Sequence, residues 1–156
     1  MTSAPRQRFF GLSRLHKLAL HGCASLLWST GLFWQLAQWD RDSGWGGQSV
    51  VDLAGAVSPW LLKMHGAGAM GFLIVFGTLL PIHVHRAWVA GMNRFTGVLF
   101  MGYCALLILT GYGLYYAGGE TLRAIMKSAH LWPGLLSPLM LAGHLWAGRR
   151  AVAAQK

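Results

Sequence analysis

The sequence predicts an all-α integral membrane protein, a bundle of four transmembrane helices with both termini in the cytoplasm. Three observations lead to this prediction. Hydrophobic residues make up 54% of the 156 residues and charged residues only 11%, which differs from the composition of ordinary soluble domains. Four apolar stretches approach the length of about 20 residues that crosses a bilayer as a helix. The basic residues are also distributed unequally among the segments between these stretches.

The four predicted spans cover about residues 18–39, 61–84, 95–117 and 129–147, and together they make a single membrane domain, 1–156. The first span is too long for the apolar part of a signal peptide and has no clear cleavage site, so we expect it to be retained. Residues 40–59 contain Ser43-Gly44-Trp45-Gly46-Gly47 and are predicted to be an irregular external loop, available to cover a site or dock a partner. No internal repeat stands out.

The orientation follows from the basic residues, because cytoplasmic segments of membrane proteins are enriched in lysine and arginine. With the N-terminus inside, the inner side collects nine of the thirteen basic residues and no acid: Arg6, Arg8, Arg14, Lys17, Arg86, Arg94, Arg149, Arg150 and Lys156. The outer side receives Arg41, Lys63, Arg123 and Lys127 with all four acids. Both termini are therefore predicted to be cytoplasmic.

Several classes of function find no support in the sequence. The net charge of +9 comes from short clusters between apolar runs, which suits a membrane surface better than nucleic acid. Cys23 and Cys104 lie inside apolar runs and belong to no C-x-x-C-H motif, so covalent haem attachment is not indicated. No phosphate-binding glycine loop of the G-x-x-x-x-G-K-[ST] type is present.

Histidine is the recurring ionisable residue of the spans. Ionisable groups inside a membrane are costly and invite a functional explanation. Any one of them is equally well explained as a packed histidine bonded to a backbone carbonyl, but six near two depths favour a site. The six are His21, His65, His83, His85, His130 and His144, with His16 at the first boundary.

The predicted spans place the histidines in two layers. His65 and His130 lie near the outer ends of the second and fourth spans, and His21 lies near the inner end of the first. His144 follows His130 by fourteen residues (144 − 130), which is about 21 Å and about four turns of helix, so both rings share one face. The outer layer therefore offers His65 and His130, and the inner layer offers His21 and His144.

Two facing histidine pairs inside a helical bundle suit two haem groups, because imidazole is a common axial ligand of haem iron. A flat macrocycle needs thin helices beside it, and residues 65–71, Gly134 and Gly143 would provide them, although small residues equally suit close helix packing. Cations available for the haem propionates are Arg14, Lys17, Arg86 and Arg149 inside, and Lys63, Arg123 and Lys127 outside.

This arrangement resembles the bacterial cytochrome b subunits of membrane-bound hydrogenases and formate dehydrogenases. In that family four helices hold two haems b, with ligands from helices one and two and two ligands spaced by fourteen residues on helix four. The matching residues are His21, His65, His130 and His144, and residues 109–116 (Leu-Thr-Gly-Tyr-Gly-Leu-Tyr-Tyr) are also similar. The resemblance implies an electron-transfer subunit of the respiratory chain in the bacterial inner membrane, working between an outer redox partner and quinone.

The chain departs from the family in two ways. It is short, and it carries an additional His83-x-His85-Arg86 sequence at the inner end of the second span. By depth, His83 or His85 could replace His21 as an inner ligand. The same three residues are also candidates for contacts with a quinone or a propionate, and a hydrogen-bonded boundary histidine explains each of them equally well.

Two other functions remain open at this point. A stand-alone quinone-reducing oxidase would resemble the small bacterial four-helix cytochromes b that oxidise superoxide, but in those the third helix carries histidines and here residues 95–117 have none. A haem-free metal carrier or membrane anchor is the third possibility, since histidine also binds zinc and copper. Transport sites usually add carboxylates, and no acid lies within a span.

Overall fold

The computed structural model describes residues 12–43, 46–91 and 93–153, and within these ranges the chain is helical with short turns and no strand. The prediction of an all-α protein is confirmed. Four long helices alternate with turns, and a π-helical turn and a short helix follow the second. In chain order the elements are α1 (Arg14–Ser43), α2 (Gly47–Leu79), η1 (Leu80–Val84), α3 (His85–Val89), α4 (Arg94–Tyr116) and α5 (Glu120–Ala153).

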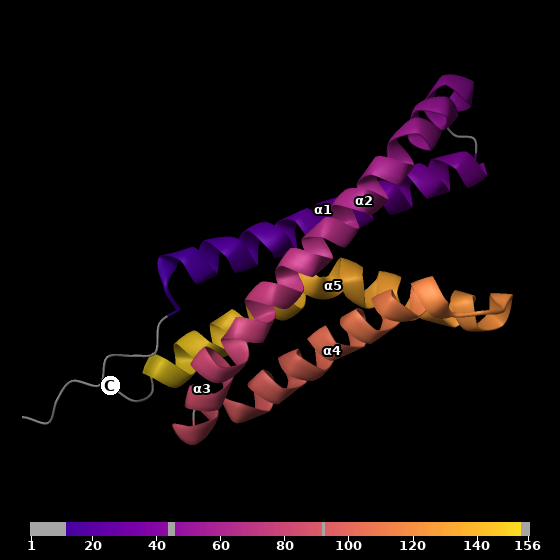
Figure 1. Ribbon diagram of the computed structural model, residues 1–156. Coiled ribbons are helices and arrows are strands. Elements are labelled where there is room, and N and C mark those ends of the chain that lie inside the picture. Colours follow the sequence, from indigo (N-terminus) through magenta and orange to yellow (C-terminus); the bar gives the residue numbers. More distant parts are fainter. Residues whose placement is uncertain (1–11, 44–45, 92, 154–156) are drawn as a thin grey trace, which may run out of the picture.

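The long helices form two antiparallel hairpins, α1–α2 and α4–α5 (Figure 1). The hairpins lie together at the end that holds the start of α1, α3 and the end of α5, and they diverge toward the opposite end. The main packing is within each hairpin, and α1 also contacts α5. The two hairpins are therefore two units whose inner faces meet part-way along their length.

Two side-chain hydrogen bonds anchor α5 near its two prolines, Pro133 and Pro138. The indole Nε1–H of Trp28 on α1 donates to the carbonyl of Leu135 at 3.1 Å. The hydroxyl of Tyr103 on α4 donates to the carbonyl of Pro133. A carbonyl oxygen has two lone pairs, so each of these carbonyls can accept a bond from a neighbouring helix. The bonds connect α5 to α4 in its own hairpin and to α1 in the other.

The predicted loop over residues 40–59 is wrong, because the structure is helical at both ends of this segment. Residues 40–43 complete α1, and α2 begins at Gly47. Polar residues interrupted the apolar run without interrupting the helix: the Gln48 side chain donates to Asp52 one turn later, at 3.0 Å. Gly44 and Trp45, which belonged to the loop prediction, lie outside the described residues.

Local hydrogen bonds explain how α2 starts early and passes through a proline. The Asp40 carboxylate accepts the N–H of Gly46 at 2.9 Å and closes the turn between α1 and α2. Gly47 follows with a φ of 72°, a left-handed conformation that favours glycine. Further along, the Ser58 hydroxyl donates to the Ala54 carbonyl at 2.6 Å, and Pro59 is accommodated within the helix.

The inner end of the second span contains a change of helix type. Residues Leu80–Val84 form a π-helical turn, and the N–H of His85 donates to the carbonyl of Leu80, five residues earlier. Pro81 lies in this turn, and its missing N–H weakens the ordinary ladder there. Single π-helical turns of this kind redirect the side chains that they carry and occur frequently at functional sites. The turn carries His83.

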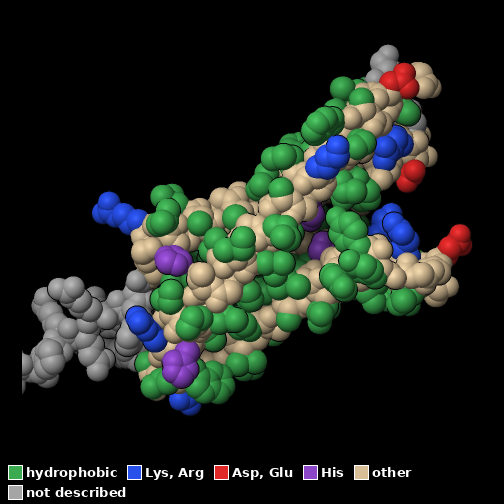
Figure 2. Space-filling view, in the orientation of Figure 1, with side chains coloured by type: hydrophobic (Ala, Val, Ile, Leu, Met, Phe, Trp, Pro, Cys, Tyr) green, Lys and Arg blue, Asp and Glu red, His purple; other side chains and the backbone are tan. Residues whose placement is uncertain are grey.

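Within the described residues, two helical stretches are long and apolar enough to cross a membrane, Val50–Val89 and Arg94–Tyr116. Very few side chains are buried, and no large side chain is fully buried in the described part of the chain. Large hydrophobic side chains such as Phe33, Ile74 and Phe95 are exposed on the outer surfaces, and apolar atoms cover much of the face in Figure 2. Extensive exposed apolar surface is typical of a protein that contacts lipid.

The acids and the basic residues expected inside lie at opposite ends of the molecule. The four acids lie on the hairpin tips at the diverging end: Asp40, Asp42, Asp52 and Glu120. At the opposite end lie the first residues of α1, the α3–α4 turn and the last residues of α5, which carry the basic residues expected inside. Arg6, Arg8 and Lys156, which contributed to the predicted orientation, lie outside the described residues.

Candidate functional site

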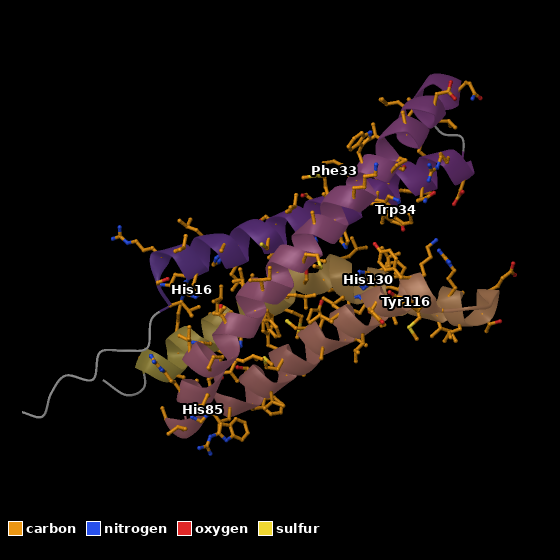
Figure 3. All side chains as sticks on the ribbon, viewed as in Figure 1. His16, Phe33, Trp34, His85, Tyr116 and His130 are labelled. Atoms are coloured by element: carbon orange, nitrogen blue, oxygen red, sulfur yellow. The ribbon has the colours of Figure 1, made fainter. Side chains whose placement is uncertain are left out.

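The structure brings His65 of α2 and His130 of α5 together where the two hairpins diverge (Figure 3). Their ring centroids are 6.2 Å apart, and the ring planes are nearly perpendicular, at 78°. Each histidine comes from the second helix of its hairpin. The outer pair predicted from the sequence is therefore a close pair formed across the contact between the two hairpins.

The His130 ring is held by the helix next to it in its own hairpin. Its Nδ1 lies 3.1 Å from the Leu107 carbonyl oxygen and 3.2 Å from the Thr110 hydroxyl. A carbonyl only accepts hydrogen bonds, so Nδ1 must carry the proton. This tautomer leaves the lone pair on Nε2, which is the atom that then can coordinate a metal.

The His65 ring is held in the same way by α1. Its Nδ1 lies 3.0 Å from the Thr30 hydroxyl oxygen. The Thr30 hydroxyl gives its own proton to the Leu26 carbonyl at 2.6 Å. Its oxygen is then left to accept the ring N–H, so His65 also presents Nε2.

A glycine follows each threonine and makes room for the ring. A Cβ on Gly31 would lie 3.3 Å from Cε1 of His65, and a Cβ on Gly111 would lie 3.0 Å from Cε1 of His130. Carbon atoms in favourable contact are about 3.5–4.0 Å apart. Any side chain at either position would therefore push the histidine that the neighbouring threonine holds.

These contacts come from a short internal repeat that the sequence analysis overlooked. The pattern Gly-x-x-x-Leu-Leu-x-x-Thr-Gly occurs on α1 and again on α4, and Thr30 and Thr110 are 80 residues apart (110 − 30). The repeated residues are Gly22, Leu26, Leu27, Thr30 and Gly31, and Gly102, Leu106, Leu107, Thr110 and Gly111. The pattern is visible in the sequence, but threonine and leucine in apolar runs gave no reason to look for it.

The separation of the two rings in the outer pair would allow both to bind one metal ion. Two metal–nitrogen bonds, each about 2.0–2.1 Å, span about 4 Å. The 6.2 Å between the ring centroids leaves room for this span. The donor set also fits, because haem supplies four nitrogens and needs two axial ligands from the protein.

The second histidine of α5, His144, lies in different surroundings. Its ring stacks on Phe100 of α4, with centroids 4.8 Å apart and planes 12° from parallel. It opens onto an almost wholly apolar cavity of about 140 Å³ between α4 and α5. The lining residues are Thr96, Leu99, Phe100, Leu139, Met140, Gly143 and His144.

The other histidines of the inner end differ in their exposure and in their hydrogen bonds. The exposed His21 bonds through Nδ1 to the Lys17 carbonyl on its own helix, at 2.6 Å. In the described part of the chain, the Nδ1 atoms of His83 and His144 are both buried without a hydrogen-bond partner. His85 is exposed in α3.

The glycines expected to make the helices narrow beside a haem fall into two groups. Gly68 faces Leu26, and Gly71 faces Cys23, so both allow α2 to pack closely on α1. Gly134 and Gly143 of α5 have open space where a side chain would lie, as a thin surface beside a ligand requires. The cations suggested for propionates are all on the exposed surface: Arg14, Lys17, Lys63, Arg86, Arg123, Lys127 and Arg149.

Comparisons of the chain with protein-family models, with curated proteins and with solved structures each gave no match. The geometry of the histidines and their neighbours is therefore the basis for assigning a function.

Proposed function

We propose that the chain is a di-haem membrane cytochrome b with four transmembrane helices and both termini in the cytoplasm, located in a bacterial inner membrane. It would carry electrons between a redox partner at the outer face and the quinone pool. The four spans would be provided by α1, α2 with α3, α4 and α5. Two of these stretches are apolar enough to cross a membrane by composition alone, and the other two pack against them as the antiparallel partners in the hairpins.

The observation that supports this proposal best is the pair formed by His65 and His130. The two rings approach at 6.2 Å, both have Nδ1 engaged by a neighbouring helix, and both have Nε2 available. Two nitrogen ligands suit a macrocycle better than bare zinc, which takes three or four ligands from the protein.

The inner haem is proposed to be held by His144 on α5. Haem at the two levels would supply one-electron redox chemistry, and the two α5 histidines are fourteen residues apart (144 − 130), about 21 Å along the helix axis. His21 and His83 are the two candidates for the second inner ligand. The buried, unpartnered Nδ1 of His83 and its place in a π-helical turn favour His83.

The two ends of the molecule differ in what they offer to reactants. The tip of the α1–α2 hairpin, with Asp40, Asp42 and Asp52 beside Arg41, would lie outside and offer charged groups of both signs to a partner. At the inner end, the exposed His85 and Arg86 of α3 lie beside the turn that carries His83. They are the candidates for contacts with a quinone head group or a propionate.

Substitution of the outer histidines tests the proposal. We expect His65→Ala and His130→Ala each to remove one b-type haem per chain, seen as a smaller α band in reduced-minus-oxidised spectra and a lower pyridine-haemochrome yield. His16→Ala is the matched control, because the His16 ring bonds to Ser13 of its own segment at 2.7 Å. Unchanged haem content in both outer variants would contradict the proposal.

A further inference from the structure

We infer that the outer histidine pair is built from two copies of one half-site, in which Thr30 and Thr110 are equivalent positioning residues for His65 and His130. This inference rests on the proposed function, because it concerns how these histidines would be presented to haem iron. It assigns a role to the two buried threonines, which would otherwise be packing residues of α1 and α4.

The hydrogen bonds of the two threonines run in a defined direction. Each threonine hydroxyl lies close to the carbonyl four residues earlier, Thr30 to Leu26 at 2.6 Å and Thr110 to Leu106 at 2.7 Å. A hydroxyl has one proton and two acceptor lone pairs. Once that proton goes to the carbonyl, the oxygen accepts from the histidine ring, at 3.0 Å for His65 and 3.2 Å for His130.

A hydrogen bond to the threonine hydroxyl changes the properties of the histidine ring. Histidines that bind metals usually donate their second N–H to a fixed acceptor, which sets the tautomer, orients the ring and makes the ligand more basic. A more basic imidazole stabilises ferric iron relative to ferrous iron. The threonines would therefore lower the reduction potential of the outer haem and hold the two ligand planes near the 78° that the structure shows.

The two half-sites share three parts. Each consists of a threonine, the glycine after it and a histidine on the next helix, and at His130 the Leu107 carbonyl is a second acceptor. The two threonine-to-histidine segments differ in length, 35 and 20 residues. The threonine–histidine contact is the same in both half-sites, so equivalent substitutions on α1 and α4 should have effects of the same sign.

The test compares Thr30→Val and Thr110→Val with Thr30→Ser and Thr110→Ser in the purified protein. Valine keeps the shape of threonine and removes the oxygen, whereas serine keeps the oxygen. Thr78→Val is the matched control, because the Thr78 hydroxyl also donates to its own helix, at 2.7 Å to Val75, on the exposed surface of α2. The readouts are the reduction potential of each haem and the low-spin ferric EPR signal, which reports the angle between ligand planes.

We expect both valine variants to raise the potential of the outer haem and to alter its EPR signal, with the inner haem unchanged. Each tenfold loss in the preference for ferric over ferrous iron appears as a rise of about 59 mV. The serine variants should stay close to the wild type. Valine variants that behave like Thr78→Val would overturn the positioning role, and a shift in only one of them would overturn the equivalence.

A wild-type protein without haem would defeat the proposed function but would still allow the positioning role to be tested. Nitrogen-15 NMR of the ring nitrogens distinguishes the Nδ1–H tautomer from the Nε2–H tautomer. We expect His65 and His130 to be Nδ1–H in the wild type, and to lose this preference in part in the corresponding valine variant. The opposite tautomer in the wild type would refute the inference directly.

Discussion

Gly111→Ala is the substitution for which the structure gives the clearest expected magnitude. The new Cβ would lie 3.0 Å from Cε1 of His130, so the ring must retreat by about 0.5 Å or more to reach a normal carbon–carbon distance. The ring cannot retreat without stretching its bonds to the Leu107 carbonyl and the Thr110 hydroxyl. Binding constellations need their ligands placed within about 0.5 Å.

The matched control for this substitution is Gly102→Ala on the same helix, where a Cβ would meet nothing within 4 Å. Alanine in a helix interior is favoured over glycine by about 0.5–1 kcal/mol, so this control should unfold at the same or a slightly higher temperature. Overpacking at Gly111 should instead cost about 1–3 kcal/mol, and haem affinity at the outer site should fall by about 10–100-fold. Thermal unfolding in detergent and haem content after gel filtration measure both effects. Equal haem retention in the two variants would refute the reasoning.

Three further predictions follow from the same structure. His83→Ala should remove the inner haem and His21→Ala should leave it bound, as judged by spectra of the two purified variants. Loss of the inner haem in the His21 variant alone would identify His21, on α1, as the second inner ligand. Trp28→Phe removes the donor to the Leu135 carbonyl and should lower the free energy of unfolding by about 1 kcal/mol, which denaturant titration in detergent would detect as a lower midpoint. A reporter enzyme active only in the cytoplasm, fused after the last residue, should be active, and an inactive fusion would contradict the proposed orientation.

The sequence predicted the helices well where apolar composition alone determines them. The predicted span 95–117 corresponds closely to α4, Arg94–Tyr116, because both of its ends are marked by a turn. The segment 40–59 was predicted as a loop because its hydropathy is low. Hydropathy indicates where contact with lipid ends, whereas a helix ends only where its backbone hydrogen bonds end. Asp40 accepts the N–H of Gly46, and α2 begins at Gly47 soon after α1 ends at Ser43, which depends on local hydrogen bonds rather than on composition.

The candidate site was predicted in part. Depth arguments paired His65 with His130, and the structure brings these two rings together. The threonines that hold them were not predicted, because one threonine in an apolar helix commonly bonds only to its own backbone. The second ligand of the inner layer could not be predicted, since depth alone does not distinguish His21 from His83. The π-helical turn that carries His83 depends on how the helix accommodates Pro81.

The central claim is that His65 and His130 hold haem iron between the two hairpins. Its most direct test is a pyridine-haemochrome determination on the purified wild-type protein, together with its reduced-minus-oxidised spectrum. We expect a b-type α band and two haems per chain, since one ligand pair is proposed at each of the two levels of α5. A colourless protein from a host that makes haem b would contradict the account and favour a haem-free carrier or anchor.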